Sequence, residues 1–196
     1  MSGASRRDFL RGGLFRRTPS ASAAPPPAAP PAKTIPVLRP PGARPEPEFL
    51  SACTRCGECI AACPHGAVRM AGARFREAAG TPMVSPFDAP CRMCAETPCI
   101  TACKPHALLR LPGAGLPAMG LAAIQTHNCL AHQGTTCTAC SERCPIPDAI
   151  RLTAGKPAVD PRICTGCGVC QHVCPAPNNA VLLMPSLRLP GSRPHG

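Results

Sequence analysis

Sixteen cysteines in this 196-residue chain fall into four groups of four, with none left over. We call these groups the first to fourth quartets, in chain order. Their members are Cys53, Cys56, Cys59 and Cys63; Cys91, Cys94, Cys99 and Cys103; Cys129, Cys137, Cys140 and Cys144; and Cys164, Cys167, Cys170 and Cys174. Four thiolates so close in sequence are typical ligands of a soft metal centre, so each quartet is a candidate site.

The first and fourth quartets have the spacing C-x-x-C-x-x-C-x-x-x-C-P and end at Pro64 and Pro175. In this run three thiolates hold one 4Fe-4S cluster and the fourth binds a neighbouring cluster. A cubane has four iron corners, each needing one thiolate, so two quartets should fold together around two clusters. We therefore predict four 4Fe-4S clusters, with all sixteen cysteines as ligands and about sixteen irons per chain.

The second and third quartets depart from this spacing. Four residues lie between Cys94 and Cys99, and Lys104 precedes the proline that should follow the quartet directly. In the third quartet seven residues separate Cys129 from Cys137. Both quartets keep four thiolates, so we expect a different loop path and the same number of ligands.

Other metal or cysteine chemistry fits the pattern less well. Zinc would use paired C-x-x-C motifs and has no need of the C-x-x-x-C-P endings. Structural disulfides suit an even cysteine count, but C-x-x-C at this density would be strained. No C-x-x-C-H motif indicates c-type haem. Each cluster has four cysteines, so the chain's histidines are not needed as ligands. These are His65, His106, His127, His132, His172 and His195.

The composition leaves little material for an ordinary hydrophobic core. Aromatic residues make up 3% of the chain, Trp and Tyr are absent, and 28 residues are proline. Proline disfavours long helices and wide sheets. The clusters must therefore act as the core, and we expect metal binding to be coupled to folding.

The formal net charge of +11 points at first to nucleic acid. Each 4Fe-4S cluster with four thiolates carries about −2, so four clusters leave roughly +3. With so few aromatic side chains to stack on bases, we expect no nucleic-acid binding. Catalytic triads, paired carboxylates and phosphate-binding loops are not evident, so we expect no enzyme activity of its own.

The cysteines lie in one segment of the chain. Residues 1–47 form a basic, Pro-rich tail and residues 185–196 a second tail, both expected to be disordered, while residues 48–184 form the cluster-bearing body. Short apolar segments follow the quartets at residues 67–68, 107–109, 149–150 and 180–183, and extended segments precede three of them at residues 83–84, 122–124 and 157–159. The apolar segment after one quartet and the extended segment before the following quartet should form a hairpin over the clusters.

This organisation predicts an α+β, bacterial-ferredoxin-like fold with two pseudo-symmetric two-cluster units. The spacing between quartets is similar throughout, so two pairings remain open. We favour a nested pairing, in which the first quartet joins the fourth and the second joins the third. Cys63 would then complete the cluster held by the fourth quartet. In the alternative, tandem pairing, the first quartet joins the second and the third joins the fourth.

The N-terminal tail contains Ser-Arg-Arg-Asp-Phe-Leu at residues 5–10, which resembles a twin-arginine export motif. A translocated signal then needs an apolar stretch. Here Arg11, Arg16 and Arg17 follow, and an Ala/Pro segment over residues 18–32 cannot form an apolar helix. We therefore expect a cytoplasmic protein without a membrane span. The tail is either a solvated basic end or a short partner-binding segment.

Three stretches of the body resemble the ferredoxin-type proteins of periplasmic nitrate reductase and methylamine dehydrogenase systems, the NapF, NapG and MauM group. They are residues 49–56, residues 128–144 and residues 163–170. The displaced Cys129 followed by Gln133-Gly134 is the most specific mark. Pro98-Cys99 and Met119-Gly120 resemble NapG and MauM in particular. The resemblance covers residues 48–184 and the Ser-Arg-Arg motif.

Within this group, the lack of an apolar signal segment is similar to NapF, which is cytoplasmic. That resemblance implies an accessory 4Fe-4S protein that assists maturation of the catalytic subunit of a periplasmic nitrate reductase. Its expected partner is this molybdenum-containing subunit. The alternative is an electron-transfer subunit, similar to NapG and MauM, that feeds a reductase or dehydrogenase system. A chain of four clusters suits electron transfer.

Overall fold

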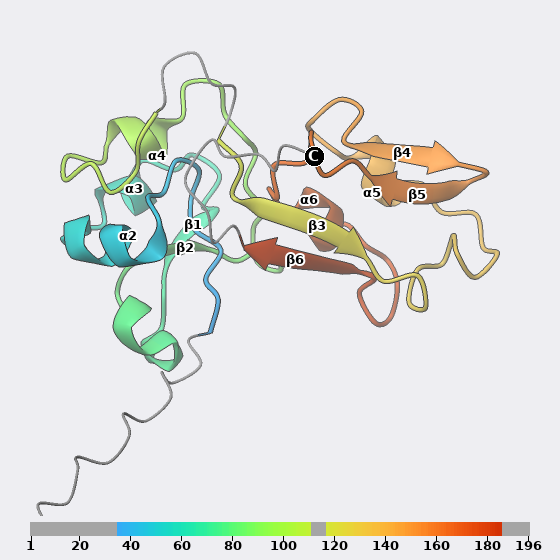
Figure 1. Cartoon of the computed structure of the whole chain (residues 1–196), viewed down its shortest axis with the longest axis horizontal. Coiled ribbons are helices and arrows are strands. Elements are labelled where there is room, and N and C mark those ends of the chain that lie inside the picture. The colour runs from blue at the N-terminus through green and yellow to red at the C-terminus, as the bar shows by residue number, and fades with distance from the viewer. Residues whose placement is uncertain (1–34, 111–116, 186–196) are drawn as a thin grey trace, which may run out of the picture. The chain divides into compact units, whose positions relative to one another are not determined.

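Short helices and two-stranded sheets build residues 35–110 and 117–185, which are the residues that the structure, a computed structural model, describes (Figure 1). We call residues 35–110 the N-terminal half and residues 117–185 the C-terminal half. Both halves belong to one compact unit. The twin-arginine-like motif and, except for Pro185, the predicted tail over residues 185–196 lie outside the described residues.

Each quartet contributes its third cysteine to a helix of a single turn. The four helices are α3 (Glu58–Ala61), α4 (Pro98–Thr101), α5 (Ala139–Glu142) and α6 (Val169–His172). In α3 and α6 the preceding residue is a glycine with φ of 81° or 86°. Glycine adopts this left-handed conformation without a steric penalty, so the chain can turn sharply from the cysteine loop into the helix. Two more helical segments are α2 (Glu46–Ala52) and the 3-10 helix η1 (Ala73–Ala78).

Antiparallel strand pairs connect the quartets. Strand β1 (Val68–Met70) pairs with β2 (Pro82–Val84) between the first and second quartets. Strand β4 (Ile150–Thr153) pairs with β5 (Lys156–Val159) between the third and fourth quartets. Two of the three predicted hairpins are therefore confirmed.

The third predicted hairpin, between residues 107–109 and 122–124, is wrong. Strand β3 (Gly120–Ile124) pairs instead with β6 (Val181–Pro185), which follows the fourth quartet (Figure 1). Leu108 forms a bridge with Ala43, before the first quartet. In each half, backbone pairing therefore joins the segment before its first quartet to the segment after its second.

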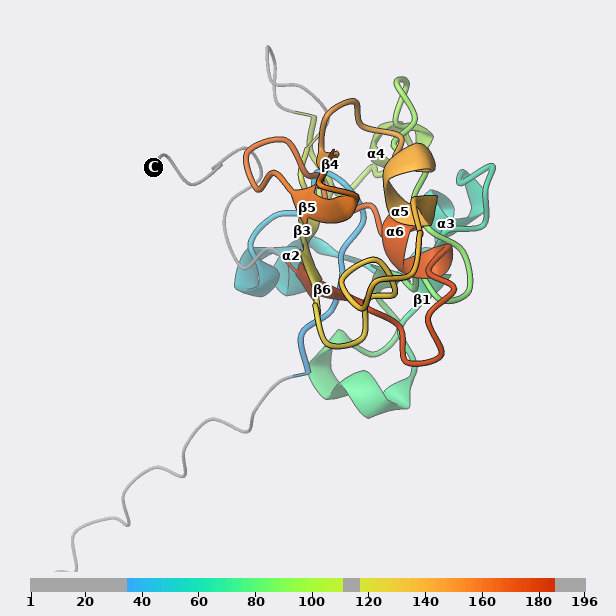
Figure 2. The same cartoon turned by 90° about the vertical axis from the view of Figure 1, so that its right-hand side faces the viewer.

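Helix contacts follow the same division. Helix α3 contacts α4 in the N-terminal half, and α5 contacts α6 in the C-terminal half. The view in Figure 2 shows α5 directly beside α6. The first quartet therefore lies against the second, and the third against the fourth.

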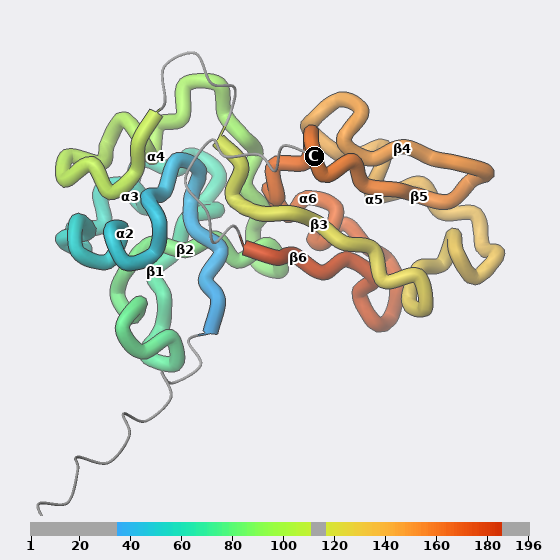
Figure 3. Tube along the Cα trace, in the orientation of Figure 1, coloured from blue at the N-terminus to red at the C-terminus, as the bar shows by residue number. Residues whose placement is uncertain are grey.

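The ordered fold begins upstream of residue 48, where the sequence placed the start of the body. Val37 and Leu38 are buried, and so is the side chain of Arg39. Arg39 Nε donates to Glu46 Oε2 over 2.9 Å, and its guanidinium lies 4.4 Å from the centroid of the Phe49 ring. A cation over an aromatic face is stabilised by the ring quadrupole. This contact holds residues 37–42 against α2, in the blue segment of the trace in Figure 3.

Membrane-spanning helices were also sought in the described ranges. None of the helices there combines the length and the apolar composition that a bilayer crossing requires.

Candidate iron–sulfur sites

Four groups of cysteines can be distinguished in the structure, and we number them as sites. Site 1 consists of Cys53, Cys56, Cys59 and Cys103, which line a cavity of about 330 Å³ with Phe49 and Leu108. Three of its cysteines come from the first quartet and one from the second. Burial raises the pKa of the Cys59 thiol to about 12, and the Cys103 thiolate is the next largest cause. Cys103 therefore lies close to Cys59.

Site 2 consists of Cys63, Cys91, Cys94 and Cys99, which line a cavity of about 350 Å³. Here Cys63 from the first quartet joins three cysteines of the second. Burial raises the pKa of the Cys99 thiol to about 11, and among the other cysteines Cys63 has the largest effect on it.

The nested pairing predicted from the sequence is therefore wrong. Cys63 lies with Cys91, Cys94 and Cys99, not with the fourth quartet. The tandem pairing holds because the backbone closes each half on itself, through the bridge between Ala43 and Leu108 and through β3 and β6. A nested arrangement would require the first quartet to leave the second, whose helix α4 it contacts.

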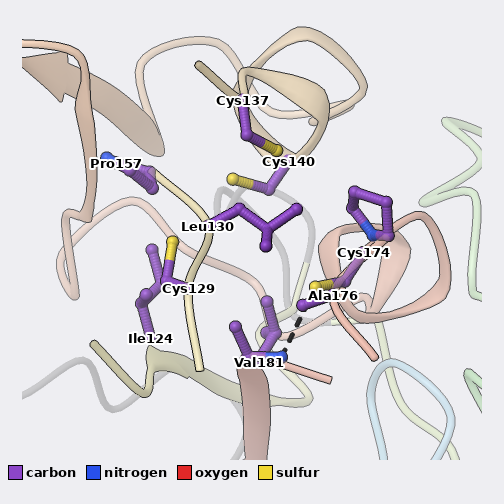
Figure 4. Close-up of a pocket in the computed structure, with 11 residues that line it drawn as sticks. Ile124, Cys129, Leu130, Cys137, Cys140, Pro157, Cys174, Ala176 and Val181 are labelled. Carbon is purple, nitrogen blue, oxygen red and sulfur yellow. Dashed lines mark hydrogen bonds between the residues drawn. The ribbon is translucent and has the colours of Figure 1, made fainter. Parts of the chain in front are cut away.

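Site 3 consists of Cys129, Cys137, Cys140 and Cys174, around a cavity of about 360 Å³ (Figure 4). The displaced Cys129 is brought back to Cys137 and Cys140 by the loop between them. Figure 4 shows Leu130 between these three cysteines and Cys174. The pKa of the Cys140 thiol is raised to about 11. Burial is the largest cause, and the thiolates of Cys129 and Cys137 are the next largest.

Site 4 consists of Cys144, Cys164, Cys167 and Cys170. Burial raises the pKa of the Cys170 thiol to about 12. The thiolates of Cys167, Cys164 and Cys144 are the next causes, in that order. The structure therefore places the fourth cysteine of the third quartet with three cysteines of the fourth.

Two sites from different halves influence each other. The pKa of the Cys91 thiol in site 2 is raised to about 12 by burial and then, among the thiolates, by Cys99 and Cys167. Cys167 belongs to site 4, yet it has a larger effect on Cys91 than Cys94 of the same site. Sites 2 and 4 are therefore neighbours.

Backbone N–H groups point at several of the sulfurs. Leu108 N lies 3.4 Å from Cys103 Sγ, and Ala180 N lies 3.4 Å from Cys174 Sγ, the contact drawn as a dashed line in Figure 4. Gly166 N lies 3.4 Å from Cys164 Sγ. Such donors stabilise the negative charge of a ligating thiolate and tune the potential of a bound cluster.

The donor set and the cavities fit a 4Fe-4S cluster. Each site has four sulfurs, all sixteen cysteines are free, and the cavities at sites 1 to 3 are lined mainly by cysteines and apolar residues. In the described ranges no three Cys, His, Asp or Glu side chains converge on one point as a single metal ion would need. The raised thiol pKa values mean that iron must displace protons on binding, since only thiolates act as ligands. The four sets of cysteines are therefore suited to a polynuclear iron group, with the quartets paired in tandem.

In the first, second and fourth quartets, the turn between the first two cysteines has a left-handed residue before the second cysteine. Its φ is 59° at Arg55, 51° at Met93 and 67° at Gly166. This conformation costs a non-glycine residue free energy, which must be offset by the contacts of the loop. At Gly166 a side chain would overlap the backbone of Gly120, so only glycine fits.

Sequence reasoning missed two features of site 4. The hydroxyl of Thr165 is buried and has no hydrogen-bond partner among the described residues, yet its side chain lowers the pKa of Cys167 and so lies beside that sulfur. The other is Pro86, which packs on Gly168. Thr54 occupies the same place in the first quartet. A threonine at this place in the sequence therefore does not predict a contact with a ligand sulfur, because only burial distinguishes Thr165 from Thr54.

Comparison with known proteins agrees with this donor set. A family model described as a 4Fe-4S binding domain matches residues 49–69, which contain the whole first quartet. The chain thus carries a recognised iron–sulfur binding sequence at sites 1 and 2.

Longer matches extend over most of the chain, which belongs to the family of ferredoxin-type proteins that includes MauM and NapG. It is 42% identical over 166 residues to the methylamine utilization ferredoxin-type protein MauM of Methylophilus methylotrophus, covering 79% of this chain and 74% of that protein. It is 40% identical over 162 residues to the ferredoxin-type protein NapG of Escherichia coli, covering 76% and 70%. The ferredoxin-type protein NapF of Escherichia coli is 32% identical over 142 residues, covering 70% and 80%. The specific resemblance to NapF is therefore not supported, and MauM and NapG are the nearer of these relatives.

Proposed function

We propose that this protein is a one-electron carrier that binds four 4Fe-4S clusters and passes electrons to a reductase or dehydrogenase system. The observation that carries the proposal is the assembly of sixteen cysteines into four sites of four, each completed by a cysteine from a second quartet. A bound 4Fe-4S cluster supplies a one-electron redox couple whose potential the protein sets.

The two halves support a fold of two similar two-cluster units. Each half contains a pair of contacting helices, one hairpin between its quartets and one pairing between its ends. Each unit holds two sites that exchange their fourth cysteines. This organisation brings sites together in pairs, which suits the movement of electrons between them.

Two functions remain to be compared, electron transfer and assistance in maturation of a catalytic subunit. The similarity to MauM and NapG favours electron transfer, since NapF is the more distant of these relatives. Buried cysteines favour retention of the metal, because seven of the sixteen are buried in the folded chain. A protein that hands its iron to a partner would need accessible ligands. In this proposal the protein has no enzyme activity of its own, and its partner is a redox protein of such a system.

Metal analysis of anaerobically purified protein tests the first part. We expect about sixteen irons and a similar amount of acid-labile sulfide per chain, with uptake of about four electrons on reduction by dithionite. Zinc with little sulfide would contradict the cluster assignment. A value near eight irons would mean that only two sites are loaded.

A mixing experiment separates electron transfer from maturation. The reduced protein is mixed with a c-type cytochrome as one-electron acceptor, and the cytochrome is then separated from it. We expect reduced cytochrome and unchanged iron in the ferredoxin-type protein. For maturation, the matching experiment uses an apo-form of a molybdenum nitrate reductase subunit. Transfer of iron to that subunit would support the maturation function instead.

The cytoplasmic location stays a prediction, because the motif on which it depends lies outside the described residues. Cell fractionation with N-terminal sequencing tests it. We expect an intact N-terminus in the cytoplasmic fraction. A processed form in the periplasm would contradict this location and would leave the electron-transfer function unaffected.

A further inference from the structure

Sites 2 and 4 are joined by a direct backbone contact. Cys91 N donates to the carbonyl oxygen of Cys167 over 3.0 Å. Both residues are buried, with 8% and 6% of their surface exposed. One is a ligand of site 2 in the N-terminal half, and the other is a ligand of site 4 in the C-terminal half. A single hydrogen bond therefore connects the ligands of two sites in different halves.

The segment before Cys91 packs tightly on the loop of site 4. Pro86 lies so close to Gly168 that a Cβ there would overlap the proline ring. His172 Nδ1 donates to the Pro86 carbonyl oxygen over 2.9 Å. Gly168 and His172 flank helix α6, so this contact fixes the position of the segment against the fourth quartet.

The hydrophobic core around sites 2 and 4 is shared between the halves. Leu38, Val84, Cys91 and Met93 from the N-terminal half pack with Met119, Cys167 and Val169 from the C-terminal half. The core around site 1 contains residues of the N-terminal half alone, and the core beside site 3 contains residues of the C-terminal half alone. Sites 1 and 3 therefore lie away from the shared core.

We propose that electrons cross between the two halves at the contact of Cys91 with Cys167, so that the four sites form a chain in the order 1, 2, 4, 3. This inference rests on the proposed electron-carrier function. Sites 1 and 3 are then the outer sites, where one-electron donor and acceptor proteins exchange electrons with the chain. Each crossing moves one electron from site 2 to site 4 or back, with no net oxidation of the protein.

The exposure of the cysteines is consistent with this order. Site 1 contains the exposed Cys56 and site 3 contains a single buried cysteine, Cys129, whereas each inner site contains two buried cysteines and no exposed one. An outer site must come within reach of a partner, and an inner site has no such need. The order differs from the order of the quartets in the sequence, because the loop of the fourth quartet lies at the contact between the halves.

Two variants that each retain two sites test the order. The inner-site protein keeps sites 2 and 4 and carries Cys53→Ala, Cys56→Ala, Cys137→Ala and Cys140→Ala. The outer-site protein keeps sites 1 and 3 and carries Cys91→Ala, Cys94→Ala, Cys164→Ala and Cys167→Ala. Iron analysis should give about eight irons in each. After full reduction, we expect electron paramagnetic resonance to show spin–spin splitting in the inner-site protein and its loss in the outer-site protein.

A second pair of variants tests the contact in the full chain with all ligands present. Gly168→Ala forces a side chain against Pro86, while Gly57→Ala changes the matching residue of the first quartet, where no atom lies within 4 Å of the new Cβ. The two glycines have φ of 86° and 81°, so the backbone strain is matched. In the fully reduced protein we expect Gly168→Ala to reduce the magnetic interaction between the halves and Gly57→Ala to leave it unchanged.

The outcomes separate this inference from the proposed function. If the wild-type protein binds no clusters or takes up no electrons, the electron-carrier function fails. If it is reduced normally, but the outer-site protein shows the splitting and the inner-site protein does not, the order of sites is wrong. An equal response of Gly168→Ala and Gly57→Ala would likewise overturn the crossing point. If a two-site protein loses its remaining iron, the comparison of Gly168→Ala with Gly57→Ala decides whether the proposed crossing point is right.

Discussion

The loops at residues 53–59 and 164–170 carry cysteines at the same spacing, yet one faces solvent and the other is enclosed by the protein. In the first loop Thr54, Arg55 and Cys56 are exposed. In the second, every residue from Thr165 to Cys170 is buried. The ligand spacing therefore determines what is bound, while the surroundings determine how accessible it is.

The residues between the cysteines account for this difference. Arg55 in the first loop donates to the carbonyl oxygens of Ala79 and Glu77 over 3.2 Å each. Its counterpart in the second loop is Gly166, which lies on the backbone of Gly120. Glu58 is likewise replaced by Val169, which is 2% exposed. The loop at residues 53–59, which we call the outer loop, carries charged residues at these positions. The loop at residues 164–170, the inner loop, carries small or apolar residues there.

The largest effect on iron content is expected when Gly166 of the inner loop is replaced by arginine, the residue at the matching position of the outer loop. In Gly166→Arg the side chain meets the Gly120 backbone, so the loop cannot close around site 4. We expect the loss of roughly a quarter of the iron. Arg55→Gly removes exposed hydrogen bonds worth about 1 kcal/mol but also relieves the left-handed strain at this residue, so it should change stability little and retain all the iron. Iron and sulfide analysis measures both, and full iron content in Gly166→Arg would show that the two loops are interchangeable.

A smaller effect is expected from exchanging the residue types at Glu58 and Val169, the second pair of matching positions. Val169→Glu buries a carboxylate without a partner in the shared core, which should cost about 3 kcal/mol. Glu58→Val lies at the surface and should change stability by about 0.5 kcal/mol or less. The measurement is the urea concentration at which the visible absorbance of the clusters is lost. Equal midpoints for the two variants would contradict the difference in burial.

Removal of iron should distinguish the two loops kinetically. Site 1 contains the exposed Cys56, whereas three of the four ligands of site 4 are cysteines of the buried loop. We expect an iron chelator to remove iron from site 1 in the earliest phase. In a protein with Cys53→Ala and Cys56→Ala that phase should disappear, leaving the slower phases. An early phase that survives in this variant would place the accessible iron elsewhere.

The smallest effect is expected at the threonines after the first cysteine of each loop. Thr165 has a buried hydroxyl without a partner beside Cys167, while Thr54 is exposed. A hydroxyl beside a ligand sulfur can rotate to donate to it, which stabilises the reduced cluster. Thr165→Val should therefore lower one reduction potential by on the order of 40 mV, equivalent to about 1 kcal/mol.

Thr54→Val is the matched control for this potential. It should leave all four potentials unchanged in a redox titration followed by electron paramagnetic resonance. A purely structural role of Thr165 would change stability without this shift. Equal shifts in both variants would mean that burial of the hydroxyl is irrelevant.

The sequence predicted two of the three hairpins correctly, and the grouping of neighbouring cysteines, because these depend on local spacing. Cysteines three residues apart, and extended segments such as 157–159, leave few other local structures. Pairing of the quartets depends instead on contacts between distant segments, such as β3 with β6. Successive quartets lie 28, 26 and 20 residues apart, and this difference is too small to determine the pairing. The similarity of the first and fourth quartets suggested that they belong together, whereas the structure separates them.

The start of the fold was difficult to predict for a related reason. Residues 37–42 contain Arg39, Pro40 and Pro41, a composition typical of a solvated linker. Their burial depends on the contact of Arg39 with Glu46 and Phe49. Composition describes a segment on its own and cannot show that a later helix accepts its arginine.

Tandem pairing also determines when each site can be completed during synthesis. The ligands of sites 1 and 2 all lie at or before Cys103, and the bridge that closes the N-terminal half involves Leu108. Sites 1 and 2 therefore have every ligand available before Cys129 leaves the ribosome. Domains generally fold as units in the order of synthesis. The first pair of sites can thus form on the growing chain and provide the surface on which the second half assembles.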